Sequence, residues 1–185
     1  DETVEGYWEG LLNGKSGVAK MTLCDSSGYP CQVAGEVTGF DPCNYMDSKE
    51  ARRMARFSQL VVAAAFNALA DSRIDIATED SDRLGIVLGN GIGGLPDTEE
   101  QCGIMNNKGG MRVSPFFIPM ILPNMAAANV SRLIGLKGYS STVITACAAG
   151  TQGIGEGFEV IRRGHADVVF SGGTEAGITK LALSG

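Results

Sequence analysis

Cys147 has the sequence setting of a nucleophile. It lies in the segment Val143-Ile-Thr-Ala-Cys-Ala-Ala-Gly150, where a β-branched, apolar run passes into small residues and then into a helical pattern. A sulfur at such a strand-to-helix turn meets the unpaired N–H groups and the positive dipole end of the helix, which favour the thiolate. The same N–H groups can stabilise an oxyanion on an attacked acyl carbon. The alternative is a small buried cysteine that fills a strand–helix gap, and position alone leaves both interpretations open.

His165, the single histidine of the chain, cannot serve Cys147 as a base. The helix predicted between them is about 16 residues long, which is ~24 Å at 1.5 Å per residue. We expect His165 on the surface at the C-terminal end of that helix, where the dipole favours a cation. A histidine that works with Cys147 therefore has to come from outside these residues.

A second cluster of chemically notable residues is cationic. Lys49, Arg52, Arg53 and Arg56 are spaced i, i+3, i+4 and i+7, so one helix would carry them on one side. They fall at the start of the predicted helix, where the macrodipole is already positive and each cation costs about a few tenths of a kcal/mol. Two interpretations remain: an ordinary solvated face, or a docking patch for an acidic partner.

Composition narrows the class of protein. Lys plus Arg is 15 and Asp plus Glu is 21, a net charge of −6, which argues against a general nucleic-acid binder. Hydrophobic residues make up 44% of the 185 residues, enough for a core. The longest apolar run, Leu60–Phe66, is far shorter than the ~20 residues of a membrane span. The five cysteines form no C-x-x-C pair, which favours free thiols in a reducing compartment over disulfides or zinc.

Strand and helix patterns alternate along the chain, which indicates an α/β fold with a mostly parallel sheet. The predicted strands are residues 32–37, 83–89, 141–145 and 167–171. The first two predicted helices are residues 4–12, with Thr3 as N-cap and a stop at Gly14, and 49–71, with Ser48 as N-cap. A third helical stretch is predicted over 114–133, with an irregular first part caused by Pro119 and Pro123. The fourth, residues 148–163, carries an apolar stripe of Ile154, Phe158 and Ile161. The Gly-rich turn at 89–94 is expected to pack its backbone close to a ligand or partner, not to open a helix.

Six motifs in order carry a resemblance to a known family. The chain resembles the elongating β-ketoacyl-acyl-carrier-protein synthases, the thiolase-fold condensing enzymes of type II fatty-acid synthesis. The motifs are Gly6-Tyr-Trp-Glu-Gly-Leu-Leu-Asn-Gly-Lys-Ser-Gly17, Lys49-Glu-Ala-Arg-Arg-Met54, Gly91-Ile-Gly-Gly94, Ser114-Pro-Phe-Phe-Ile-Pro119, Thr145-Ala-Cys-Ala-Ala-Gly150 and Gly164-His-Ala-Asp-Val-Val-Phe-Ser-Gly-Gly-Thr-Glu-Ala176.

The resemblance implies a role for each candidate residue. It makes Cys147 the acyl-accepting nucleophile, with its own N–H as half of the oxyanion hole. It places three residues along the acyl-chain pocket, the last two reaching in from the partner subunit of a homodimer: Ile92, Phe117 and Ile118. It assigns the patch that grips the acidic acyl carrier protein to Lys49, Arg52 and Arg53.

The resemblance also implies what lies outside the chain. Residues 1–185 correspond to a partial ketosynthase N-terminal domain, truncated at both ends, of a layered αβαβα fold. The family's first strand would precede Asp1. The second half of the fold would carry two histidines, a lysine and the second oxyanion donor, so we expect the fragment alone to be inactive.

The implied reaction needs no cofactor of its own, because phosphopantetheine arrives on the carrier protein. The implied location is the cytoplasm, or the plastid or mitochondrial matrix of a eukaryote. Two alternatives within the same fold remain. One is the ketosynthase domain of a polyketide synthase, and the other is a non-catalytic chain-length partner subunit, which typically lacks the cysteine that is present here.

Overall fold

The computed structural model describes residues 3–185, which form two compact units. The smaller unit comprises the chain up to Phe40 together with Ile178–Gly185, and the larger unit is Asp41–Gly177. All of the sequence features that suggest chemistry fall in the larger unit.

The smaller unit has little regular structure. Its elements are helix α1 (Val4–Leu12), antiparallel strands β1 (Val18–Lys20) and β2 (Val33–Gly35), and the short helix α8 (Lys180–Ser184). The Thr3 hydroxyl accepts a hydrogen bond from the Gly6 N–H at 3.1 Å, and Gly14 follows the helix with a φ of +62°, so both predicted ends of α1 are confirmed. Strand β1 was not predicted, because its three residues are too few to show an alternating pattern.

The larger unit is built on a three-stranded parallel sheet in the order β4–β3–β5. The strands are β3 (Leu84–Gly89), β4 (Ser140–Val143) and β5 (Val168–Gly173). All six residues of β3 are buried, as expected of a central strand covered on both faces. The predicted parallel α/β arrangement is therefore confirmed. The outer strands β4 and β5 are only half-buried, so the expectation that they are buried strands is wrong for this chain.

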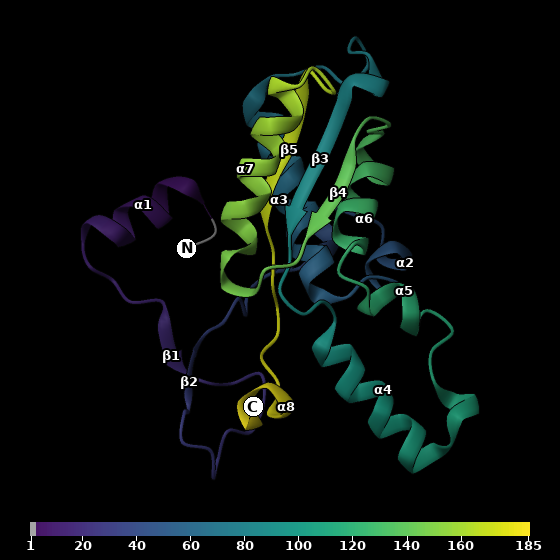
Figure 1. Cartoon of the computed structure of the whole chain (residues 1–185). Helices are drawn as coiled ribbons and strands as arrows, with labels where there is room; N and C mark the ends of the chain where they lie inside the picture. Colours follow the sequence, from purple (N-terminus) through teal and green to yellow (C-terminus); the bar gives the residue numbers. More distant parts are fainter. Residues whose placement is uncertain (1–2) are drawn as a thin grey trace. The chain divides into compact units, whose positions relative to one another are not determined.

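Helices cover both faces of this sheet, which gives the larger unit three layers (Figure 1). On one face lie α3 (Arg56–Ser72) and α6 (Met125–Ile134), which pack against the alternate residues Leu84, Ile86 and Leu88 of β3. On the other face lies α7 (Ala149–Arg162), which packs on Val87. The alternation of side chains along β3 thus divides one apolar run between two helical layers.

The predicted helix over 49–71 is in fact two helices. Helix α2 (Ser48–Ala51) is capped by Asp47, whose carboxylate accepts from the Lys49 N–H at 2.7 Å, so Ser48 is not the cap. The chain then breaks before α3, because Met54 and Ala55 are drawn into the core, where they are 3% and 1% exposed. The Gln59 side-chain amide donates to the carbonyls of Ala51 and Met54, at 2.8 and 3.2 Å, and so links α3 to the residues on the other side of the break.

Two further segments differ from prediction. Helix α4 (Leu95–Lys108) follows directly on the Gly-rich turn, which does open a helix, with Pro96 in its first turn. Its side chains are exposed or half-buried, so the sequence carries no apolar stripe to reveal it. The helical stretch over 114–133 is irregular in its first part, as predicted, and is split into α5 (Phe117–Ile121) and α6, because Leu122 is extended before Pro123. Short 3-10 turns complete the unit at Pro42–Asn44, Ser81–Arg83, Gly110–Arg112 and Ala146–Ala148.

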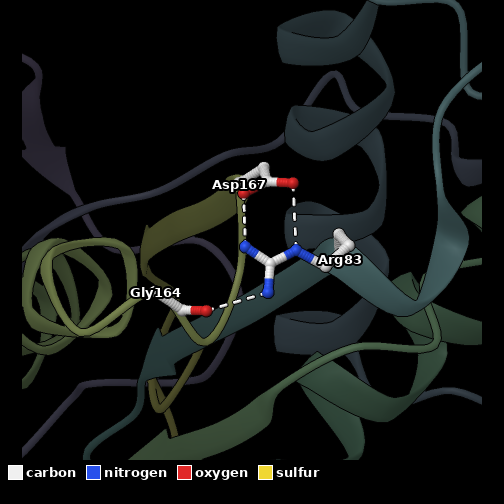
Figure 2. Close-up of polar contacts among 3 residues, drawn as sticks. All are labelled: Arg83, Gly164 and Asp167. Atoms are coloured by element: carbon white, nitrogen blue, oxygen red, sulfur yellow. Dashed lines mark hydrogen bonds and ion pairs between the residues drawn. The ribbon is translucent and has the colours of Figure 1, made fainter.

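An ion pair joins the amino-terminal ends of β3 and β5 (Figure 2). The Arg83 guanidinium donates to both carboxylate oxygens of Asp167, at 3.0 Å from Nε and 2.5 Å from Nη2. Its third nitrogen donates to the Gly164 carbonyl at 2.8 Å. The bonds from Arg83 lower the pKa of Asp167 below its ordinary value. This two-pronged pair aligns the two strands where they begin, at the edge of the sheet away from Cys147.

Glycines let α7 lie unusually close to the sheet. The predicted stripe of Ile154, Phe158 and Ile161 is the exposed side of this helix, with Phe158 at 65% exposure. The buried side is instead made of small residues and one valine: Ala149, Gly153, Gly157 and Val160. A Cβ at Gly153 would stand 2.6 Å from the Gly172 carbonyl oxygen and 3.0 Å from the Gly89 nitrogen. The helix backbone therefore rests directly on the backbones of β3 and β5.

Replacing glycines within α7 tests this packing. We expect Gly153→Ala to destabilise the protein by about 1–3 kcal/mol, because the new methyl group has to displace backbone. Gly155→Ala is the matched control, since a Cβ there meets nothing within 4 Å. It is expected to stabilise the helix by up to about 1 kcal/mol. Urea unfolding of the two variants measures the difference, and equal free energies of unfolding would contradict the packing described.

Candidate functional site

Cys147 lies in the turn that joins β4 to α7, as predicted. Strand β4 ends at Val143, a 3-10 turn spans Ala146–Ala148, and α7 begins at Ala149. The Cys147 thiol is free and the residue is exposed, so it does not fill a gap in the core of this chain. The interpretation of Cys147 as a buried packing residue is therefore wrong. Its position in front of α7 is the one in which helix N–H groups favour an anion.

The backbone next to Cys147 is strained. Among residues 3–185, Ala146 and Arg73 are the two non-glycine residues with a positive φ, and Ala146 has a φ of +49°. Such a conformation costs about 1–3 kcal/mol in a residue with a Cβ and persists only when its surroundings enforce it. The turn that presents the sulfur is thus held by its neighbours rather than by local preference.

Cys147 opens on a cavity of about 690 Å³. Its walls come from the loop after β3, the first turn of α7 and the turn after β5. These are the carboxyl ends of the parallel strands, the usual place for ligands in an open α/β sheet. Much of the wall is glycine backbone, including Gly91, Gly150 and Gly173, so little side-chain bulk stands in front of the sulfur.

A polar network ties these three walls together. The Asn90 backbone N–H donates to the Val143 carbonyl at 3.0 Å, and its side-chain amide donates to the Thr174 carbonyl at 2.6 Å. The Thr174 hydroxyl in turn donates to the Phe57 carbonyl of α3 at 2.7 Å. The Glu175 carboxylate accepts from the N–H groups of the loop after β3. Sequence reasoning missed these three side chains. A signal was available for Asn90, which is a polar residue directly after the glycine that ends the buried strand β3.

The predicted acyl-pocket residues fall in two places. Ile92 lines the cavity beside Cys147 and is 57% exposed. Phe117 and Ile118 lie on α5 and are outside the lining of this cavity, with Ile118 also 57% exposed. The structure therefore brings Ile92, but not Phe117 or Ile118, to the Cys147 cavity of the same chain.

The predicted cationic patch is exposed but does not follow one helix. Lys49 belongs to α2, Arg52 caps its C-terminal end, and Arg53 lies in the break before α3, so the expectation of one continuous helical face is wrong. Arg56 is the first residue of α3 and is half-buried. The Arg53 guanidinium stacks over the Phe116 ring, 4.8 Å from its centroid, which holds its charge at the surface.

His165 lies at the far end of α7, as predicted. Its backbone N–H donates to the Val160 carbonyl at 3.0 Å, and its ring stacks on Tyr139 with 6.4 Å between centroids. Within residues 3–185, no group of three His, Cys, Asp or Glu side chains is placed to hold a metal ion. The helices of the same residues include none that is both long and apolar enough to cross a bilayer.

Valine substitutions in the Cys147 turn test the strain at Ala146. We expect Ala146→Val to destabilise the protein by about 1–3 kcal/mol more than Ala148→Val, because a β-branched residue is strongly disfavoured at positive φ. Ala148 is the matched control: it is exposed in the same turn, with an ordinary φ of −87°. Thermal and urea unfolding measure both variants, and equal destabilisation would count against a strained turn.

Comparisons with known proteins agree over the whole chain. Residues 1–185 match the family described as "Beta-ketoacyl synthase, N-terminal domain". The 3-oxoacyl-[acyl-carrier-protein] synthase 2 of Staphylococcus aureus is 44% identical over 182 residues, which are 98% of this chain and 45% of that protein.

Solved structures give the same result. The ishigamide ketosynthase/chain length factor aligns with a TM-score of 0.89 and 28% identity, over 98% of this chain and 45% of that one. A type II polyketide synthase ketosynthase in complex with its acyl-carrier protein aligns with a TM-score of 0.75 and 29% identity, over 80% and 43%. The chain spans less than half the length of these relatives. Its three-layered unit is part of a thiolase-like fold, and the chain belongs to the β-ketoacyl synthase family, in which it corresponds to the N-terminal domain.

Proposed function

We propose that this chain supplies the nucleophile half of a β-ketoacyl-acyl-carrier-protein synthase that elongates acyl chains in type II fatty-acid synthesis. The observation that carries the proposal is the exposed Cys147 thiol in front of α7, beside a cavity walled by glycine backbone. The family membership and the 44% identity to a 3-oxoacyl-[acyl-carrier-protein] synthase support it.

In the first step the Cys147 thiolate attacks the thioester carbonyl of an acyl group on the carrier protein. The oxyanion that forms is stabilised by N–H groups of the Cys147 turn, the Cys147 N–H among them. Collapse of this intermediate breaks the carrier's C–S bond, and the pantetheine thiolate leaves and takes up a proton. The acyl group then rests on Cys147 as a thioester.

In the second step a malonyl-carrier thioester loses carbon dioxide, and the electron pair of the broken C–C bond becomes an enolate. Its carbon attacks the acyl carbon, the C–S bond to Cys147 breaks, and a β-ketoacyl thioester two carbons longer is released on the carrier. The histidines, the lysine and the second oxyanion donor for this step belong to the other half of the fold. Neither a metal nor a nicotinamide takes part in the proposed steps.

The remaining assignments belong to the same proposal. Ile92 lines the acyl-chain pocket of its own chain, and Phe117 and Ile118 reach the pocket of a homodimer partner. Ile118 is exposed and Phe117 half-buried, which leaves them accessible for that contact. We place the protein in the cytoplasm, or in the plastid or mitochondrial matrix of a eukaryote. Its five free cysteines are in keeping with a reducing compartment.

Lys49, Arg52 and Arg53 are proposed to bind the acidic carrier protein. They are exposed cations on a chain of net charge −6, and a structurally similar ketosynthase is known in complex with its acyl-carrier protein. Electrostatic complementarity between these exposed cations and an acidic partner would favour the contact.

A polyketide ketosynthase is the second candidate, because one structurally similar ketosynthase belongs by name to a type II polyketide synthase. Its identity of 29% is lower than the 44% to the 3-oxoacyl-[acyl-carrier-protein] synthase 2 of Staphylococcus aureus, which favours the first proposal. A non-catalytic chain-length subunit is disfavoured by the presence of Cys147. Product analysis of the full-length protein separates the two active candidates, since one releases a β-ketoacyl thioester after a single extension and the other accumulates poly-β-keto products.

Loss of the sulfur tests the nucleophile. In the full-length protein, Cys147→Ala should abolish the mass increase that an acyl-carrier thioester produces on the wild type, because no other thiol occupies this turn. Cys102→Ala, which removes an exposed cysteine from α4, should keep the adduct. Intact-protein mass spectrometry makes the measurement, and an acyl adduct that persists on Cys147→Ala rules the assignment out.

Charge reversal tests the docking patch. Arg52→Glu/Arg53→Glu in the full-length protein is expected to weaken carrier binding about tenfold at low salt and less at high salt, because ionic screening weakens charge–charge attraction. The matched control is Arg73→Glu/Lys137→Glu, which makes the same charge change at the far end of α3 and before β4. Titration calorimetry at two ionic strengths reports both affinities; equal losses for the two double variants would remove the patch.

A further inference from the structure

Glu175, directly after the turn that ends β5, reaches across to the loop that follows β3. One carboxylate oxygen, Oε2, accepts from two consecutive backbone N–H groups, those of Gly91 at 3.1 Å and Ile92 at 2.9 Å. The other oxygen, Oε1, accepts from the Ala176 N–H at 3.0 Å. A single side chain therefore joins the ends of two parallel strands at the edge of the sheet where Cys147 lies.

Gly91 lies close to both the Glu175 carboxylate and the turn that presents Cys147. A Cβ on Gly91 would stand 2.8 Å from the Glu175 Oε2 atom and 3.9 Å from the Ala146 Cα atom. Gly91 thus lies between the carboxylate on one side and the turn that presents Cys147 on the other. Whatever fixes the 91–92 backbone also sets how closely that loop approaches the strained Ala146 turn.

The two ends of the loop after β3 have other anchors. At its start, Asn90 is bonded through its backbone to Val143 and through its side chain to Thr174. At its end, the Gly94 N–H donates to the Ile121 carbonyl of α5 at 3.0 Å. Between these anchors, the Glu175 carboxylate is the acceptor for the Gly91 and Ile92 amides. Hydrogen bonds to an ionised carboxylate are stronger than neutral ones, so this contact determines where the middle of the loop lies.

Ile92 gives this contact a consequence for binding. Its side chain lines the Cys147 cavity, while its own N–H is held by Glu175. We propose that Glu175 is a positioning residue that, through the Gly91 and Ile92 amides, fixes the Ile92 wall of the cavity and thereby sets which acyl-chain lengths reach Cys147. The proposal rests on the acyl-transfer function above, because it concerns the selectivity of that first step.

Acylation of the full-length protein by two probes tests the proposal. The probes are butyryl- and dodecanoyl-pantetheine, and intact-protein mass spectrometry follows the rate of adduct formation on Cys147. Glu175→Ala is expected to change the ratio of the dodecanoyl to the butyryl rate by about tenfold, the factor that about 1.4 kcal/mol of lost discrimination produces. Glu175→Gln keeps an oxygen acceptor and should shift the ratio in the same direction by less. Glu156→Ala on the exposed side of α7 is the matched control and should leave the ratio unchanged.

Two further measurements separate the outcomes. Alkylation of Cys147 by iodoacetamide should proceed at the wild-type rate in Glu175→Ala, because the thiol itself is intact, and amide hydrogen exchange over residues 90–94 should be faster. An unchanged rate ratio together with unchanged exchange overturns the proposal while the acyl-transfer function stands. Absence of acylation of the wild type by either probe overturns both. If Glu175→Ala does not fold, the near-isosteric Glu175→Gln decides by the same ratio.

Discussion

The site depends on how closely the backbone of α7 lies against the backbones of β3 and β5. A Cβ at Gly89 would stand 2.0 Å from the Ala149 carbonyl oxygen, and one at Gly173 would stand 2.6 Å from the Gly150 Cα atom. Only glycine permits this approach, and it brings the first turn of the helix down onto the carboxyl ends of the strands. The strained Ala146 and the exposed Cys147 follow from this constraint, because the chain has to leave β4 and enter α7 within a few residues.

Around this contact the polar groups act as connectors between elements that are distant in sequence. Asn90 belongs to the loop after β3, Thr174 to the turn after β5, and the Phe57 carbonyl to the first turn of α3. Each bond joins two of the three walls of the cavity or secures one wall to the helical layer behind it. These hydrogen bonds fix the walls of the cavity relative to one another, so its inner surface can consist largely of glycine backbone beside a free thiol.

The sequence predicted the position of the candidate nucleophile more accurately than it predicted the helices. The central strand was predictable because Leu84–Leu88 is a short apolar run bounded by turn residues, and Cys147 was predictable because a β-branched strand meets small residues there. Helix α4 was not, since its side chains are exposed or half-buried and carry no apolar stripe. The break between α2 and α3 was hidden because Met54 and Ala55 continue a helical pattern while leaving the helix for the core. Glu175 was missed because its partners are backbone amides, which no side-chain pattern reports.

The Arg83–Asp167 pair and the Cys147 cavity lie at opposite edges of one sheet. Strand alignment is secured at the amino edge by a guanidinium that also binds the Gly164 carbonyl, far from any loop that contributes to the cavity. The alignment of β3 and β5 at their amino ends therefore does not depend on the loops at the carboxyl edge. Because the two functions are separated in this way, the loops around the cavity can diversify in evolution while the strands beneath them keep their alignment.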